Sequence, residues 1–156
     1  MIIRDARAQD LVAMVRLSSQ AFGVSAWEPG VFHRLLQESL SRPRHERILV
    51  AENSPGHVVG YLILQLIVDE AEIQAVAVEE RCRRHGIATA LLIEGLKHCA
   101  EMGGTTVFLE VRESNQAARS FYRRFGFQDY GKRPDYYRHP PEDAILMRLS
   151  LIDETC

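Results

Sequence analysis

The chain has 156 residues, of which 46% are hydrophobic and 26% are charged, and this composition predicts one domain with a sizeable core over residues 1–156. Its formal net charge of -2 gives no overall attraction to nucleic acid or to anionic lipid. We therefore expect no nucleic acid and no membrane among its partners, but a small ligand or a protein.

The cysteines and the start of the chain predict a cytoplasmic protein. Cys82, Cys99 and Cys156 are odd in number and lack the spacing of a zinc site or the density of a disulfide framework. No apolar signal stretch follows the first residues. No apolar run approaches the roughly 18 residues that a membrane span needs.

The first elements are predicted to be a short strand followed by two helices. Residues 1–4 are typical of a strand. Asp10 is placed to cap a helix that ends at Gly23. A second helical stretch begins near Pro29, and Pro43 would stop it.

The middle of the chain predicts a hairpin, a further strand and a long helix. Residues 48–51 and 58–68 are rich in branched side chains and flank a turn at residues 53–56. Residues 72–78 form another strand candidate. Residues 87–102 carry apolar side chains at helical spacing, so we expect a buried helix there.

The last third predicts a strand, a helix and two more strands. Residues 105–111 are typical of a buried strand, and Ser114 is placed to cap a helix that runs through Phe125. Residues 127–130 and 144–151 supply the remaining strands. The order β-α-α-β-β-β-α-β-α-β-β predicts an α/β fold of the strand-rich α+β type around a mixed sheet.

The segment from Arg81 to Ala88 joins a strand to a helix and has the features of an anion site. The first free N–H groups of the helix and its positive dipole end face this loop. Gly86 permits a positive φ and a close approach of the backbone, while Arg83 and Arg84 add positive charge. A solvated basic loop is the alternative. The segment lacks both the Walker pattern and the dinucleotide glycines.

A set of linked motifs resembles the GNAT superfamily of N-acetyltransferases. A strand followed by Q/R-x-x-G-x-G/A is that family's signature, and further motifs follow in the family's order. They comprise residues 75–78, 83–88, 108–112, 114–118, 121–122 and 125–127. The resemblance implies a mixed, mostly antiparallel sheet of six to seven strands, flanked by about four helices and split between strands four and five.

Within this superfamily, the chain most resembles the bacterial ribosomal-protein N-terminal alanine acetyltransferases. The run 109–115, the pair Tyr136-Tyr137 and the ending 142–147 carry this resemblance, which spans roughly residues 58–149. It implies acetyl-CoA as the acetyl donor and a protein N-terminus, such as that of a ribosomal protein, as the acceptor. The implied assembly is a monomer or a homodimer.

The same resemblance implies a set of coenzyme-binding residues on the fourth strand, in the basic loop and on the following helix. They are Val76, Ala77, Val78, Arg83, Arg84, His85, Gly86, Ile87, Ala88, Thr89 and Asn115. The strand residues are expected to act through backbone groups, because the amides of an extended pantetheine arm can pair with a strand edge.

Acetyl transfer to an amine needs a base for the amine and a proton for the departing thiolate. Glu110 lies inside an apolar strand run, where a carboxylate is costly unless it is paired or faces a cleft. The resemblance implies that Glu110 is the general base, directly or through a water. A polar strand face that meets solvent is the alternative.

Tyr122 shares a helix face with Asn115 and Ala118, at helical spacings. The resemblance implies that Tyr122 is the general acid for the coenzyme thiolate and that Asn115 binds pantetheine. The alternatives are a core aromatic for Tyr122 and a helix cap for Asn115.

On the acceptor side, the resemblance implies Trp27, Tyr136 and Tyr137 as substrate-binding residues. Tyr136 and Tyr137 are expected in a proline-flanked loop before the last strand. An aromatic connection packed on the sheet is the alternative. Glu28 and Asp135 are candidates to meet an N-terminal ammonium.

Several other functions stay open at this point. The six histidines have no partners at ligand spacing, so we expect no metal. The acceptor could be a small amine such as a polyamine, an amino acid or an antibiotic. The chain could also be a silent acyl-CoA-binding module. Nucleic-acid binding through residues 81–85 and 119–124 has less support, because no stacking aromatics are interleaved.

Overall fold

The computed structural model describes residues 1–23 and 26–152, so that Cys156 lies outside the described residues. Within these residues one seven-stranded sheet has the order β1-β2-β3-β4-β5-β7-β6. Its strands are β1 (Ile2–Asp5), β2 (Glu46–Ser54), β3 (His57–Ile67), β4 (Glu70–Val78), β5 (Thr106–Arg112), β6 (Gln128–Arg138) and β7 (Pro141–Ser150). The helices are α1 (Leu11–Phe22), α2 (Pro29–Ser41), α3 (Ile87–Glu101) and α4 (Gln116–Phe125). The predicted order of strands and long helices is confirmed.

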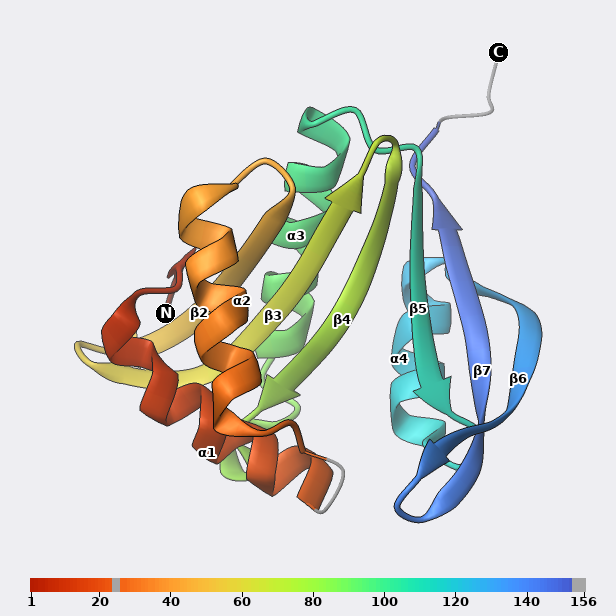
Figure 1. Cartoon of the computed structure of the whole chain (residues 1–156), viewed down its shortest axis with the longest axis horizontal. Coiled ribbons are helices and arrows are strands. Elements are labelled where there is room, and N and C mark those ends of the chain that lie inside the picture. Colours follow the sequence, from red (N-terminus) through yellow and green to blue (C-terminus); the bar gives the residue numbers. More distant parts are fainter. Residues whose placement is uncertain (24–25, 153–156) are drawn as a thin grey trace.

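The helices cover the two faces of the sheet. Figure 1 shows α1 and α2 in front of the sheet and α3 behind it. Met14 and Phe32 belong to the core on the α1–α2 face, whereas Leu91 and Tyr122 belong to the core on the α3–α4 face. None of the helices in the described part of the chain is long and apolar enough to cross a membrane.

β3 is buried on both faces because it lies between the two helical layers. Tyr61 and Ile63 point into the α1–α2 core, and Leu62 and Leu64 point into the α3–α4 core. Alternate side chains of a strand point to opposite faces, which explains the nearly continuous apolar run in this strand. Gly95 of α3 allows close packing here, because a Cβ at this position would collide with Leu62.

The predicted cap of α4 is wrong by one residue. Asn115, not Ser114, is the N-cap, and its side-chain oxygen accepts the Ala118 N–H at 3.1 Å. The Ser114 N–H instead donates to the Glu142 carboxylate at 2.6 Å. Both residue types are common caps, so the choice depends on Glu142, which lies far along the chain.

Asp10 immediately precedes α1, as predicted, but its side chain does not cap that helix. Its carboxylate accepts the Arg7 N–H at 2.7 Å and pairs with Arg4 at 2.8 Å. Burial raises the pKa of Asp10, but the hydrogen bonds from Arg4 and Arg7 prevail, and the net shift is downward. Asp10 therefore ties β1 to the turn before α1.

Candidate active site

β4 and β5 lie side by side over a short distance only. They pair in parallel from Glu70 and Thr106 to Glu72 and Phe108. Beyond this pairing the two strands diverge toward their arrowheads, as Figure 1 shows. The expected split between the fourth and fifth strands is therefore confirmed.

A β-bulge bends β4 where the two strands part. Ile63 of β3 faces Ala75 and Leu64 faces Ile73, so Gln74 is the extra residue in β4. An extra residue bends a strand and increases its twist. The bend leads the backbone of β4 after Gln74 away from β5, which leaves an open strand edge that an extended ligand can pair with.

The split opens into a cleft of about 930 Å³. Side chains from both helical layers and from β4, β5 and β6 line it. The predicted site residues along the cleft are Trp27, Val76, Glu110, Asn115, Tyr122, Tyr136 and Tyr137. Ala77 and Val78 are buried in β4, and residues 83–89 lie outside this lining. Ala118 also lines the cleft, so Asn115, Ala118 and Tyr122, which were predicted to share one face of the helix, all border the same cleft.

Glu110 projects from β5 on the α1–α2 side of the sheet. Its neighbours Leu109 and Val111 point into the opposite core, as strand alternation requires. The Glu110 side chain is 23% exposed, and its carboxylate lies 3.4 Å from the Arg133 guanidinium. The Tyr136 hydroxyl interacts with this carboxylate, and the interaction raises the pKa of Tyr136. Glu110 is thus a paired carboxylate in a cleft and does not face open solvent.

A second carboxylate, that of Glu72 in β4, lies beside Glu110. Glu72 as a whole is exposed, but its carboxyl group is partly buried and therefore partly desolvated. This desolvation raises the pKa of Glu72, the negative charge of Glu110 raises it further, and Arg133 acts in the opposite direction. The two glutamates therefore give this part of the cleft a strong attraction for a cation.

Tyr122 enters the cleft from α4, on the other side of the split. It is 9% exposed, and its ring packs at 5.2 Å from Phe121 and 5.5 Å from Phe127 between ring centroids. Burial raises the pKa of Tyr122, and Tyr137 adds a smaller upward shift. The phenol is therefore protonated at neutral pH and can donate its proton into the cleft.

Asn115 is a helix cap, which was one of the alternatives from the sequence, and it also lies at the cleft. Its Oδ1 caps α4 through the Ala118 N–H, and the residue also lines the cleft. An amide has two further donors on its nitrogen. The capping bond therefore fixes the side chain while its NH₂ group stays available to a ligand.

The loop before α3 has the geometry of an anion site. Gly86 is the N-cap of α3 with φ 79°, a left-handed conformation, and it has no side chain to cap the first turn. Arg83, Arg84 and His85 are exposed around it. Free N–H groups and a helix dipole attract anions, and a group with two phosphates suits this arrangement.

The base of this loop is held by a buried carboxylate, Glu79. It pairs with Arg16 at 3.0 Å and Arg81 at 3.5 Å, and the Cys82 thiol donates to it at 3.4 Å. Burial opposes ionisation, but the hydrogen bonds from Cys82, Arg81 and Arg16 prevail and lower the pKa of Glu79 to about 2. Glu79 thus neutralises part of the charge on Arg81 and fixes the turn.

The prediction of a loop around Tyr136 and Tyr137 is wrong, because both residues belong to β6. β6 is an edge strand, where proline is tolerated. Arg133 faces Ala144 and Tyr137 faces Glu142, so residues 134–136 lie opposite Asp143 alone. This irregularity brings Tyr136 toward Glu110.

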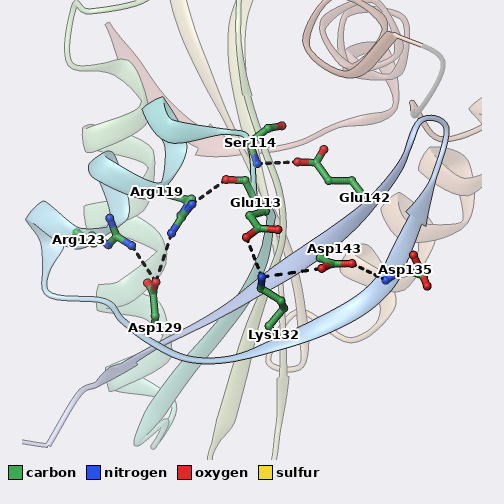
Figure 2. A network of polar contacts seen from close by, with 9 residues as sticks. All are labelled: Glu113, Ser114, Arg119, Arg123, Asp129, Lys132, Asp135, Glu142 and Asp143. Atoms are coloured by element: carbon green, nitrogen blue, oxygen red, sulfur yellow. Dashed lines mark hydrogen bonds and ion pairs between the residues drawn. The ribbon is translucent and has the colours of Figure 1, made fainter.

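A network of polar contacts fixes this irregular part of β6 (Figure 2). Asp135 has φ 54°, and its N–H donates to the Asp143 carboxylate at 2.9 Å. Lys132 donates to Glu113 at 2.8 Å and lies 3.9 Å from Asp143. The carboxylate of Glu142 receives the Ser114 N–H, so the same network reaches the start of α4.

The part of the cleft lined by Trp27, Tyr136 and Tyr137 has aromatic walls. Trp27 packs on Phe32 with 5.6 Å between ring centroids. Tyr136 and Tyr137 are 4.9 Å apart, and Arg112 lies over the Tyr137 ring at 4.3 Å from its centroid. Glu28 and Asp135, considered from sequence as partners of an ammonium, do not line the cleft.

Sequence reasoning missed Glu72, Gln74 and Arg133. Glu72 occupies an ordinary polar position of an alternating strand, and a bulge such as that at Gln74 leaves no mark in the sequence. Arg133 comes close to Glu110 only through the pairing of β5, β7 and β6.

Within the described residues, histidine, cysteine and acidic side chains form no group of three or more that could hold a metal ion.

The fold and the cleft agree with the comparison to known proteins. The model of the acetyltransferase (GNAT) family matches residues 11–127. The chain belongs to this family and is an acetyl-CoA-dependent N-acetyltransferase.

Several of the similar proteins are named as alanine N-acetyltransferases of a ribosomal protein or as N-alpha-acetyltransferases. A putative [ribosomal protein bS18]-alanine N-acetyltransferase of Bacillus subtilis is 30% identical over 96% of this chain and 95% of its own length. The N-alpha-acetyltransferase RimI of Mycobacterium tuberculosis is 34% identical over 89% of this chain and 85% of its own length. The crystal structure of the ribosomal-protein-S18-alanine N-acetyltransferase from Escherichia coli superposes with a TM-score of 0.81, at 28% identity, over 99% of this chain and 97% of that one.

Proposed function

We propose that this enzyme acetylates the N-terminal alanine of a ribosomal protein in the cytoplasm, by direct transfer in a ternary complex. The observation that carries the proposal is that Glu110 and Tyr122, from opposite sides of the split sheet, line one cleft. The names of the similar proteins from Bacillus subtilis and Escherichia coli support alanine as the acceptor residue.

The coenzyme suits the α3–α4 side of the split. The free N-terminus of α3 at Gly86, with Arg83 and Arg84, would hold the pyrophosphate. The open edge of β4 at Val76 and the amide of Asn115 would hold the pantetheine arm. Bound in this way, acetyl-CoA supplies a thioester in the middle of the cleft.

The acceptor suits the opposite side, between Trp27 and the pair Tyr136-Tyr137. Glu110 takes a proton from the acceptor nitrogen, either directly or through a water, as the new N–C bond forms. Tyr122 gives its phenolic proton to the sulfur as the C–S bond breaks. The raised pKa of Tyr122 keeps this proton in place until the thiolate departs.

Release of free thiol from acetyl-CoA tests this function. The purified protein is given a peptide with the N-terminal residues of bS18, the same peptide with a blocked N-terminus, and small amines such as spermidine. We expect thiol release with the free alanine peptide, and none above background with the blocked one. Higher kcat/KM with a small amine than with the peptide would assign the enzyme to a small-molecule acceptor.

A further inference from the structure

A second groove continues from the catalytic cleft along the sheet. It has a volume of about 350 Å³ and is lined by Gln65, Ile67, Glu70, Ala71, Glu72, Phe108, Leu109, Glu110 and Tyr130. Glu72, Leu109 and Glu110 line the cleft as well, so the two spaces share a wall at the proposed base. We call this second space the acidic groove.

The acidic groove lies on the α1–α2 side of the sheet. Ala71 of β4 and Leu109 of β5 point into the opposite core. By strand alternation, Glu70 and Glu72 therefore point to the same side as Phe108 and Glu110. This is the side from which the acceptor approaches Glu110.

The groove offers negative charge between apolar walls. Three glutamates and no basic residue are among its lining residues. Ile67 is 61% exposed and Tyr130 is 42% exposed at its edges, and Phe108 packs on Tyr130 at 5.8 Å between ring centroids. Apolar walls suit the methylene stem of a long cationic side chain, and carboxylates suit its charged end.

Two arginine side chains lie near the groove but are not among its lining residues. Arg133 pairs with Glu110 at 3.4 Å and is itself 56% exposed at its side chain. Arg148 lies over the ring of Tyr130, at 5.0 Å from the ring centroid. Among the ion pairs of the described residues, none joins Glu70 or Glu72 to Arg133 or Arg148. Arg133 offsets part of the negative charge at Glu72 from a greater distance, and the rest of that charge, together with Glu70, faces an incoming cation.

An acceptor chain has to leave the cleft once its terminal amine reaches Glu110. The acidic groove shares Glu72 and Glu110 with the cleft, so an extended chain that leaves Glu110 along this wall, at about 3.3 Å per residue, places its second and third residues over the groove. We propose that the acidic groove binds this part of the acceptor and favours a lysine or arginine side chain at its second or third position. The inference rests on the proposed function, since it needs a peptide as acceptor.

The experiment compares alanine-starting peptides that differ only in having lysine, alanine or glutamate at positions two and three. We expect kcat/KM to be about ten- to a hundredfold higher for the lysine peptide than for the glutamate peptide, the range for charge-assisted contacts. Higher salt should reduce this ratio, because screening weakens partly exposed ion pairs.

Variants assign the preference to the groove. Glu70→Gln and Glu72→Gln should each reduce the ratio of the lysine peptide to the glutamate peptide several-fold. Glu94→Gln, an exposed glutamate on α3, is the matched control and should leave the ratio unchanged. A preference that survives both groove variants would place its origin elsewhere and overturn the inference.

The outcomes also distinguish a failure of the acidic groove as a subsite from a failure of the proposed N-terminal acetylation. Equal kcat/KM for all the peptides would overturn the acidic groove as a subsite and leave N-terminal acetylation standing. Turnover of small amines with no turnover of any alanine peptide would contradict the proposed function, and the inference would fall with it.

Discussion

The guanidinium of Arg133 lies 3.4 Å from the carboxylate of Glu110, across a strand that separates β5 from β6 in the sheet. This ion pair connects the proposed base to the edge strand that carries Tyr136. The site is therefore assembled from strands that are distant in sequence, and its parts can be tested one by one.

Replacement of Glu110 tests the proposed base. Glu110→Gln keeps the size of the side chain but removes its capacity to take a proton. We expect kcat to fall by about 10²- to 10⁴-fold, the usual contribution of a general base. Steady-state kinetics with an alanine peptide measure this. Glu94→Gln, which alters an exposed glutamate on α3, serves as the control and should keep wild-type turnover.

Replacement of Tyr122 tests the proposed acid. Tyr122→Phe keeps the ring contacts with Phe121 and Phe127 and removes only the phenolic proton. We expect kcat to fall by about 10²- to 10⁴-fold while Tm changes little. Wild-type kcat in Tyr122→Phe would leave this residue with a packing role alone.

Gly86 and Gly56 form a matched pair for the coenzyme loop. Both have a left-handed φ, 79° and 78°, and a Cβ would meet no atom within 4 Å at either position. Alanine at either site should therefore destabilise the fold by a similar amount, about 1–2 kcal/mol. Only Gly86→Ala should raise the KM for acetyl-CoA. A similar rise in Gly56→Ala would argue against a binding role for the loop.

Asp143 is expected to position Tyr136 through the network in Figure 2. Asp143→Ala removes the acceptor of the Asp135 N–H and should cost about 1 kcal/mol of stability. The KM for the peptide should rise, whereas the KM for acetyl-CoA should not. Asp143→Asn keeps an oxygen acceptor and should restore most of the peptide KM. Equal rises in both KM values would contradict a role of Asp143 that is confined to the peptide.

The lowered pKa of Glu79 predicts that the folded protein loses stability as the pH falls. Its pKa falls from the ordinary value of 4.5 to about 2 in the folded state, so the folded state binds fewer protons than the unfolded state between these values. The stabilisation is present above pH 4.5 and is lost as the pH falls toward 2. Thermal unfolding of Glu79→Gln should show a smaller loss of Tm across this acidic range than wild type. Parallel curves would contradict the assignment.

The order of the elements and the split of the sheet could be predicted from sequence, because they depend on local patterns and on linked motifs. Gly86 marks its own left-handed turn, and Gly23 ends α1 as predicted. The helix caps were less accessible, since the choice between Ser114 and Asn115 depends on Glu142.

The site was predictable only in part for the same reason. Glu110 could be singled out because it interrupts an apolar run, but Arg133 could not be assigned to it before the sheet order was known. The prolines around Tyr136 and Tyr137 suggested a loop, whereas an edge strand with an irregularity tolerates them. The bulge at Gln74, which opens the sheet, is visible only in the strand register.

The most direct test is mass spectrometry of ribosomal-protein N-termini. The proteins are taken from two strains of the source organism, of which one carries the wild-type enzyme and the other the Glu110→Gln variant. We expect an alanine N-terminus that is acetylated in wild-type cells and unmodified in the variant. Identical N-termini in the two strains would contradict it.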